Sequence, residues 1–207
     1  LLECITLDGV REHQAALQAI ADDNDGNRFS GPPGHDASVD YVVETLEAAG
    51  YDPTIQEFDY LAFNILGAPT LEQTAPTPTV YVEGTDFQVM DQSDGGDVTA
   101  AVTAVDVNLV PPRASTSGCE AADFAGFPAG NIALIQRGTC TFESKAENAA
   151  AAGAIGAIIF NQGNTPAREG LINGTLGATN ESGIPVVEAT YARGEEWATT
   201  PGLTMHL

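Results

Sequence analysis

The side chains that could hold a catalytic metal are few in this chain and far apart. Its histidines are His13, His35 and His206, and no two of them are closer than 22 positions. A catalytic zinc site takes about three protein ligands in tight geometry, and the helical pattern His-Glu-x-x-His does not occur. The pair Glu195-Glu196 is interpreted as a solvent-exposed helix face. We therefore expect no metal site, no bound cofactor and no catalytic residue within these 207 residues.

Cysteine can form covalent cross-links, and the chain has three: Cys4, Cys119 and Cys140. Cys119 precedes a predicted strand and Cys140 follows it, and a fold-back of residues 120–130 can bring the two together. A disulfide here closes a loop of about 22 residues and stabilises the fold by roughly 3 kcal/mol. Two buried free thiols are the alternative. A disulfide implies an oxidising compartment, so we expect a secreted, extracellular or vacuole-like protein. Cys4 is a free thiol or pairs outside this chain.

Two asparagines lie in glycosylation sequons, Asn173-Gly174-Thr175 and Asn180-Glu181-Ser182. Such sequons accept a glycan only on a eukaryotic secretory route. Asn173 and Asn180 are therefore candidate glycosylation sites, and chance occurrence of the pattern is the alternative that we favour.

The charge of the chain excludes two classes of partner. With 29 acidic and 7 basic residues the formal net charge is −22. Nucleic acids and anionic membrane surfaces are bound through clusters of Lys and Arg, so we expect neither as a partner. Solubility outside the cell and adaptation to high salt both explain the charge, and the sequence does not separate them. No apolar run approaches the ~18 residues of a membrane span. No signal peptide is present, so for an exported protein we expect this to be a mature or trimmed chain.

Residues 131–160 predict a strand, a helix and a second strand in close succession. Ile132–Ile135 is a short apolar strand, and Thr141 is a suitable N-cap for the helix that follows. Phe142 and a series of alanines fall on one helical face, and Gly153 suits the left-handed end of that helix. Ile155–Phe160 is a nearly continuous apolar strand, as expected where both faces are covered. We therefore predict two parallel strands joined by a right-handed crossover.

The remaining chain divides into a helical part, residues 1–62, and a β-rich part, residues 63–207. Two amphipathic helices are expected at about 10–22 and 35–50, followed by an irregular strand at 55–63 and a proline-rich connection at 69–78. Two helices and one strand cannot enclose a core, so their apolar faces must rest on another domain or partner. The other elements expected in the β-rich part are strands at 79–82, 87–90, 98–107, 184–187 and 203–207 and a helix at 191–198.

The β-rich part resembles the protease-associated (PA) domain. The pattern Arg-Gly-x-Cys-x-Phe-x-x-Lys at 137–145, followed by the Ala-Gly-Ala-x-Gly pattern ending at Gly156, is specific to it. The resemblance implies an α/β, β-rich fold: a sandwich or open barrel that contains the parallel strand–helix–strand unit. Further matching segments are 118–120, 132–136, 158–161 and 184–187.

The helical part is similar to the opening of secreted zinc aminopeptidases of the aminopeptidase Y type. The matching residues are 27–42, which include Ser-Gly-Pro-Pro-Gly-His-Asp, and 46–51, Leu-Glu-Ala-Ala-Gly-Tyr. That family binds two zinc ions through His-x-Asp, a bridging Asp, a Glu-Glu pair, a further Asp and a distant His, all placed after the PA domain. None of that set is present. The resemblance therefore implies the N-terminal segment and PA domain of such an enzyme, with two zinc ions in a catalytic domain outside this chain.

For such a fragment we expect a non-catalytic role, either gating the access of peptide or protein substrates or mediating protein and peptide interaction. Its expected partners are those peptides and the catalytic domain of the same polypeptide. The alternative is a free-standing, peptide-binding PA domain of the sorting-receptor type. The helical part counts against this alternative, because a receptor PA domain needs no such helices. We expect no hydrolytic activity from these residues alone.

Overall fold

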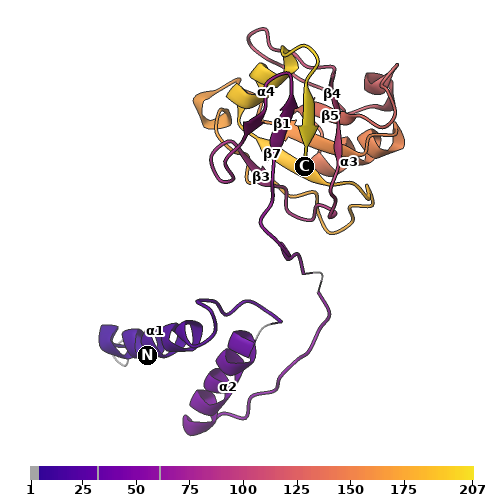
Figure 1. The fold of residues 1–207 in the computed structure, drawn as a ribbon. Helices are drawn as coiled ribbons and strands as arrows, with labels where there is room; N and C mark the ends of the chain where they lie inside the picture. Colours follow the sequence, from indigo (N-terminus) through magenta and orange to yellow (C-terminus); the bar gives the residue numbers. More distant parts are fainter. Residues whose placement is uncertain (1–4, 32, 61) are drawn as a thin grey trace. The chain divides into compact units, whose positions relative to one another are not determined.

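The computed structural model describes residues 5–31, 33–60 and 62–207. Cys4 lies outside these ranges. The chain divides into two compact units, a helical unit, Leu1–Tyr60, and a β-rich unit, Leu61–Leu207, and each is described by itself (Figure 1). None of the helices in the described ranges combines the length and the hydrophobicity that a membrane span requires.

The helical unit consists of α1, Leu7–Asp22, and α2, Pro33–Ala48. Thr6 caps α1, because its Oγ1 accepts the N–H of Gly9 at 3.1 Å. The two helices are joined by a hydrogen bond of 2.6 Å between His13 Nδ1 and the Tyr41 hydroxyl. Most apolar side chains of the unit remain exposed. The large ones are Ile5, Leu7, Val10, Phe29, Val42, Tyr51, Ile55, Phe58 and Tyr60.

The strand predicted at 55–63 is wrong: residues 51–60 contain no strand. The apolar alternation of this segment suggested a half-buried strand. A strand is stable only when a neighbouring strand pairs with its backbone. The described part of the helical unit contains no strand, so the segment has no partner there.

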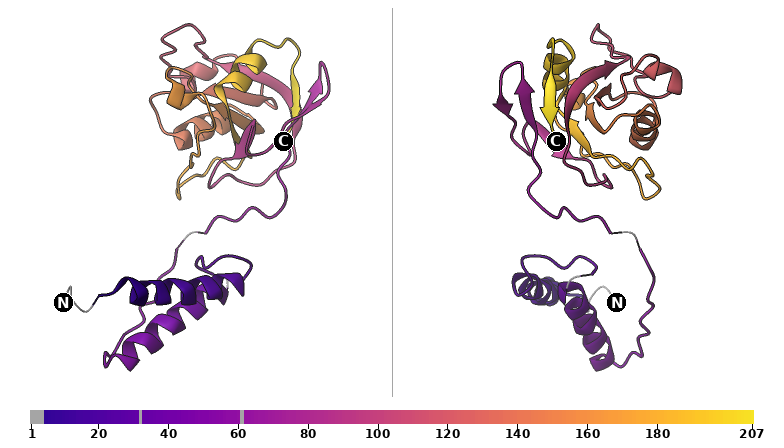
Figure 2. Two further views of the ribbon diagram at one scale, coloured as in Figure 1. Left: turned by 90° about the vertical axis from the view of Figure 1, so that its left-hand side faces the viewer. Right: turned by 45° about the vertical axis from the view of Figure 1, so that its right-hand side comes forward.

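The β-rich unit is a single eight-stranded mixed sheet with the order β2-β1-β8-β4-β5-β6-β7-β3. The neighbours β4, β5, β6 and β7 run parallel, and the outer pairings are antiparallel. The sheet is curled, so that β1 and β8 turn out of the plane of the parallel strands (Figure 2). The strands are β1 Glu72–Ala75, β2 Thr79–Val80, β3 Phe87–Val89, β4 Thr99–Val105, β5 Ile132–Gln136, β6 Gly156–Phe160, β7 Val186–Ala189 and β8 Thr204–His206.

The predicted strand–helix–strand unit is confirmed as β5, α3 (Phe142–Ala151) and β6. The two strands are parallel, with Ile132 opposite Gly156 and Gln136 opposite Phe160. Thr141 caps α3 by accepting the N–H of Ser144 at 3.2 Å. This unit forms because a short apolar run, a cap and a small-residue helix follow each other at the spacing that a crossover needs.

Two helices cover opposite faces of the parallel strands. Alternate side chains of β5 and β6 point to opposite faces, as strand geometry requires. Ala133 and Ile135 pack with Ala146 and Ala149 of α3. The side chains on the other face of β5, β6 and β7 pack with Tyr191 and Trp197 of α4, Tyr191–Ala198. Short 3-10 helices at Ala121–Phe124 and Pro166–Arg168, η2 and η3, lie in the connections.

One strand was not predicted. β1 lies within residues 69–78, which the sequence assigns to a connection, and it pairs with both β2 and β8. Its four residues, Glu-Gln-Thr-Ala, carry no apolar alternation. The pairing with β8 joins Glu72 to His206, far apart in the sequence, so only the closed sheet could indicate it.

Candidate functional site

The carboxyl ends of β4, β5, β6 and β7 meet at one edge of the sheet, because these strands are parallel. The segments that follow them are 106–117, Arg137 and its neighbours, 161–170, and Thr190. In open α/β sheets, ligands bind outside the carboxyl ends of the strands. This edge is therefore the first place to look for a binding site.

Three buried amide side chains hold the loops at this edge in place: Gln136, Asn161 and Gln162. Gln136 Oε1 accepts the N–H of Asn108 at 2.8 Å, and its Nε2 donates to the carbonyl of Gln162 at 3.2 Å. Gln162 Nε2 donates in turn to the carbonyl of Arg113 at 2.9 Å. Asn161 Oδ1 accepts the N–H of Gln162 at 2.9 Å. The loops after β4 and β6 are thus tied to the end of β5 by side-chain hydrogen bonds.

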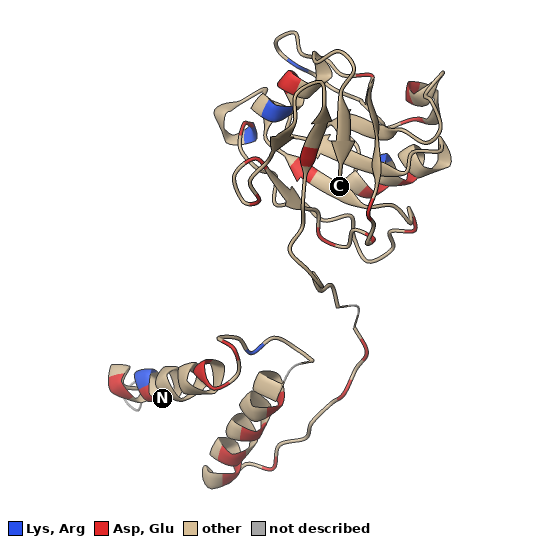
Figure 3. Cartoon of the chain, viewed as in Figure 1, with Lys and Arg blue, Asp and Glu red and all other residues tan. Residues whose placement is uncertain are grey.

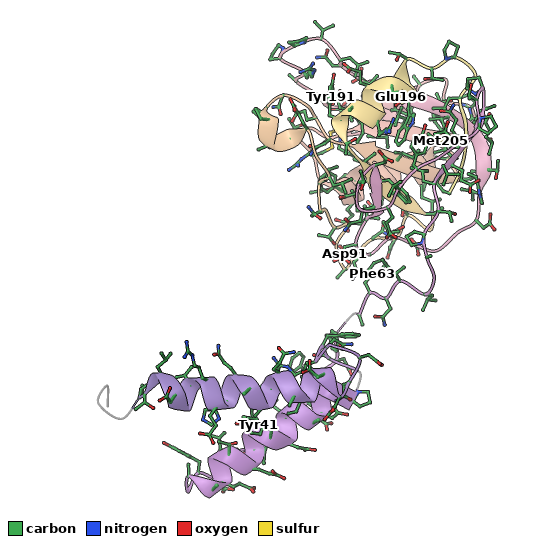
Figure 4. All side chains as sticks on the ribbon, turned by 60° about the vertical axis from the view of Figure 1, so that its left-hand side comes forward. Tyr41, Phe63, Asp91, Tyr191, Glu196 and Met205 are labelled. Carbon is green, nitrogen blue, oxygen red and sulfur yellow. A yellow bond between two sulfur atoms is a disulfide. The ribbon has the colours of Figure 1, made fainter. Side chains whose placement is uncertain are left out.

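Three half-buried arginines, Arg113, Arg137 and Arg168, project from these loops and are called the arginine cluster. Arg113 donates from Nη1 to the carbonyl of Gly163 at 2.8 Å, and its guanidinium lies 4.6 Å from the ring centre of Tyr191. Figure 4 labels Tyr191 at the start of α4. Aromatic ring and carbonyl together set the plane of this guanidinium.

The other two members of the cluster are held in the same manner. Arg137 donates from Nη1 to Asn161 Oδ1 at 3.4 Å, and its guanidinium lies 5.7 Å from the ring centre of Phe142. Arg168 donates from Nη1 to Gln162 Oε1. Each guanidinium therefore uses one donor on the protein and keeps others for a ligand, since an arginine carries five N–H donors.

No member of the arginine cluster forms an ion pair with a carboxylate in the described residues. Arg193 shows the contrast: it lies 2.9 Å from Asp86 and 2.6 Å from Glu196. Burial lowers the pKa of Arg137, the nearby charge of Arg168 lowers it further, and the carboxylate of Glu188 raises it by a smaller amount. Figure 3 shows how sparse Lys and Arg are among the many acidic residues. Unpaired cations in so acidic a chain indicate an anion-binding surface.

The cysteines predicted to pair, Cys119 and Cys140, are joined by a disulfide in the structure, with Cα atoms 5.7 Å apart. Lys145 lies beside it and is completely buried. Its Nζ donates to the carbonyl of Ser117 and lies 3.7 Å from Cys119 Sγ. Burial lowers the pKa of Lys145 to about 8, against the opposing charge of Asp123. The disulfide and the lysine together fasten the loop before η2 to α3.

The two sequon asparagines differ in how free their side chains are. Asn173 is exposed, and its backbone N–H donates to the buried carboxylate of Glu188 at 2.7 Å. Asn180 donates from Nδ2 to the carbonyl of Gln92 at 2.9 Å and reaches Asp94 Oδ2 at 3.3 Å. A glycan on Asn180 would have to displace these contacts, because Nδ2 is the atom that carries it. Glycosylation stays a prediction at both positions.

The residues considered for metal binding lie apart. His13 is bonded to Tyr41, and His206 Nε2 lies 3.0 Å from Asp97. Glu195 and Glu196 are exposed on α4, where Glu195 accepts the hydroxyl of Tyr191 at 2.6 Å. The described ranges contain no group of three or more His, Cys, Asp or Glu that could hold a metal ion.

A groove of about 400 Å³ lies elsewhere in the β-rich unit. Its walls are residues 63–70, 93–97 and 185–187 together with Val89, His206 and Leu207. Asp94, Asp97 and His206 are its ionisable groups, so it offers a largely apolar surface with acidic groups on it.

Sequence reasoning missed the arginine cluster. Its members are separated by 24 and 31 positions in the chain, as the residue numbers 113, 137 and 168 show. Arg137 belonged to the PA-domain pattern, but no local motif connects it to the others. Their shared feature, a position in a segment that follows a parallel strand, is visible only once the strand order is known.

Part of the β-rich unit matches a known class of domain. Residues 102–197 match the PA domain family, so the β-rich unit contains a PA domain, as the sequence pattern predicted.

The whole chain is similar to aminopeptidases. It is 53% identical over 207 residues to an aminopeptidase of Pseudomonas aeruginosa, covering 100% of this chain and 39% of that protein. It is 35% identical to the probable lipoprotein aminopeptidase LpqL of Mycobacterium tuberculosis, covering 97% of this chain and 38% of that protein. The chain therefore spans about two fifths of the length of the curated relatives it matches.

Solved structures agree with this assignment. An aminopeptidase from Aneurinibacillus sp. strain AM-1 matches 95% of this chain and 42% of its own, with a TM-score of 0.69 and 26% identity. A zinc aminopeptidase from Bacillus subtilis has a TM-score of 0.51 and 24% identity, covers 94% of this chain and 42% of its own, and so supports the fold alone.

Proposed function

We propose that this chain is the non-catalytic part of a zinc aminopeptidase, and that its PA domain interacts with peptides and restricts their access to the active site. Residues 1–62 are its N-terminal segment and residues 63–207 its PA domain. The observation that carries the proposal is the similarity of the entire chain to about two fifths of an aminopeptidase. The arginine cluster supplies a surface on which a peptide could be held.

Zinc belongs, in this proposal, to the remainder of the polypeptide. The residues described here do not fit a zinc site. His13 and His206 are each engaged by a single partner, Tyr41 and Asp97, and no further nitrogen or carboxylate ligand completes either pair in the described ranges. The two zinc ions and the hydrolysis that they support are therefore assigned to a catalytic domain outside this chain.

An exported enzyme fits the covalent structure of the chain. Disulfides persist in oxidising compartments, and the β-rich unit contains one. One relative is described as a probable lipoprotein aminopeptidase. We propose on these grounds that the parent protein is secreted or otherwise extracellular.

The proposal is tested by comparing the complete enzyme with a form that lacks residues 63–207. The measurement is kcat/KM for an aminoacyl anilide, a tripeptide and a peptide of about ten residues. If the PA domain gates access, the ratio of kcat/KM between the long and the short substrate changes several-fold on deletion. The anilide serves as the control for an intact active site. Equal ratios in the two forms contradict the gating role.

The alternative, a free-standing peptide-binding domain, requires that this chain alone binds a peptide and that no catalytic domain accompanies it. The helical unit, with its exposed Val10, Val42 and Phe58, counts against the alternative, since these apolar side chains need a partner surface. A complete enzyme within these residues is tested by adding zinc and an aminoacyl anilide to the purified chain. We expect no hydrolysis.

A further inference from the structure

The arginine cluster has donors that the protein does not use. Arg113, Arg137 and Arg168 account for three of the seven basic residues in a chain of net charge −22. Within the described residues, none of the three is neutralised by an ion pair. The Nε of Arg113 is buried and has no hydrogen-bond partner in the described residues. A buried donor without an acceptor costs free energy.

The three guanidinium groups are held before any ligand arrives. Two of them lie over aromatic rings, Tyr191 and Phe142, and all three donate to an acceptor on the loop after β6. The backbone of Arg113 has φ +58°, in the left-handed region that non-glycine residues rarely adopt. Fixed donors lose little side-chain entropy on binding, and this favours recognition of a small anion.

The chemistry of the site selects a carboxylate among anions. A guanidinium matches a carboxylate with two parallel hydrogen bonds, so that two or three arginines can surround one carboxylate. The buried carboxylate of Glu188 offsets only part of the repulsion between Arg137 and Arg168, and a bound carboxylate relieves more of it. Highly charged anions are disfavoured, because the strongly acidic chain repels them at long range.

We propose that Arg113, Arg137 and Arg168 form a binding site for the carboxylate of a peptide. The inference rests on the proposed function and specifies its ligand. An aminopeptidase acts on the amino end of its substrate, so the carboxyl end stays available for a second site. The carboxylate could come from the C-terminus of the peptide or from an Asp or Glu side chain, and the test separates these sources.

The test measures peptide affinity by isothermal titration calorimetry with the 207-residue chain. Three N-acetylated pentapeptides serve as probes: one with a free C-terminal carboxylate, the same peptide as its C-terminal amide, and an amidated peptide whose last residue is Asp. We expect the free acid to bind at least 10-fold more tightly than the amide. Comparable affinity of the Asp peptide shows that a side-chain carboxylate is also accepted.

Variants connect the affinity to the cluster. Arg137→Gln and Arg168→Gln are each expected to weaken binding of the free acid about 10-fold. Arg137→Lys is expected to weaken it less, since lysine keeps the positive charge but loses the two parallel N–H donors of the guanidinium. Arg28→Gln is the matched control, because it removes the same charge from an exposed position in the helical unit and is expected to change nothing. Thermal unfolding of each variant checks that the fold persists.

Several results overturn the proposal. Equal affinity for the acid and the amide shows that the chain binds the peptide but does not recognise its carboxylate. An equal loss of affinity in Arg28→Gln and Arg137→Gln shows that the net charge of the chain, and not the arginine cluster, causes the effect. Absence of binding at millimolar peptide contradicts the carboxylate site. The gating role is tested separately, by the dependence of kcat/KM on peptide length in the complete enzyme.

Discussion

At the scale of single residues, buried polar side chains in the β-rich unit hold loops in place by hydrogen bonds to their backbone. Glu188 is completely buried, and its two carboxylate oxygens accept the N–H groups of Ile172, Asn173 and Gly174 at 2.7 to 3.0 Å. Lys145 binds the carbonyl of Ser117 in the same way. Both side chains satisfy backbone groups of loops that have no strand partner. Their role is to position loops rather than to react.

The buried Lys145 predicts a dependence of stability on pH. Its pKa is about 8 in the folded chain and 10.5 as the ordinary value. Between these values the unfolded chain binds more protons, so the free energy of unfolding rises as pH increases from about 8 toward 10. Above that, the raised pKa values of Tyr81 and Tyr191 favour their neutral forms in the folded state, so stability falls as tyrosines ionise.

The measurement for this prediction is urea unfolding at a series of pH values, followed by the fluorescence of Trp197. Lys145→Met removes the titrating group and is expected to flatten the rise between pH 8 and 10, whatever its effect on stability at pH 7. An unchanged slope in Lys145→Met shows that another group causes the rise.

A second prediction at this scale concerns the contact between α4 and β6. A Cβ added at Gly194 would lie 1.9 Å from Cγ of Phe160, whose side chain is completely buried. Gly194→Ala therefore forces the helix away from the sheet and is expected to lower the free energy of unfolding by about 3 kcal/mol. Gly95→Ala is the control, since nothing lies within 4 Å of its added Cβ. Equal stability of the two variants, measured by chemical denaturation, contradicts the tight packing.

At the scale of elements, the local sequence pattern was sufficient to predict the parallel strand–helix–strand unit. It was insufficient to predict β1, near one edge of the sheet. β5, α3 and β6 carry their own signals: apolar runs, the cap at Thr141 and the left-handed Gly153 at φ +89°. β1 carries no such signal, because its residues have no apolar alternation. It is extended because its backbone pairs with β2 and β8. The segment 55–63 shows the converse: its apolar residues alternate as in a strand, but no strand in the described residues pairs with it.

The disulfide gives a prediction for the elements that it joins. It links the turn before η2 to the turn before α3 across a sequence separation of 21. Replacing both Cys119 and Cys140 by Ser is expected to lower the free energy of unfolding by about 3 kcal/mol, because the unfolded chain regains the freedom of that loop. Denaturation of the double variant should coincide with that of the reduced original chain. A double variant as stable as the oxidised chain contradicts a stabilising role for the cross-link.

At the scale of the whole molecule, the two units bury their side chains very differently. The β-rich unit has two clusters of buried apolar residues, one on each face of its parallel strands. The helical unit contributes Ala21 to the buried apolar residues and leaves Val10, Val42 and Phe58 exposed. Such surfaces mark sites of further packing.

This difference predicts the course of limited proteolysis. Residues 51–60 have no helix or strand and are largely exposed, so a protease should cut there first. The expected product is a stable fragment that retains the β-rich unit with its disulfide, identified by mass spectrometry and near-ultraviolet circular dichroism. Primary cleavage within β4 to β7 contradicts the division into two units. Cleavage in α1 or α2 at the same rate indicates that the isolated helices are themselves loosely held.

The amino-acid sequence by itself determined the features that depend on neighbouring residues. These are the helix cap at Thr141, the parallel strand–helix–strand unit and the PA-domain pattern, because each rests on residue types at short, regular spacing. The tertiary structure alone decided the pairing of β1 with β8 and the gathering of Arg113, Arg137 and Arg168 at one edge. The physical reason is that parallel strands bring the ends of distant segments together, and such proximity leaves no trace in local composition.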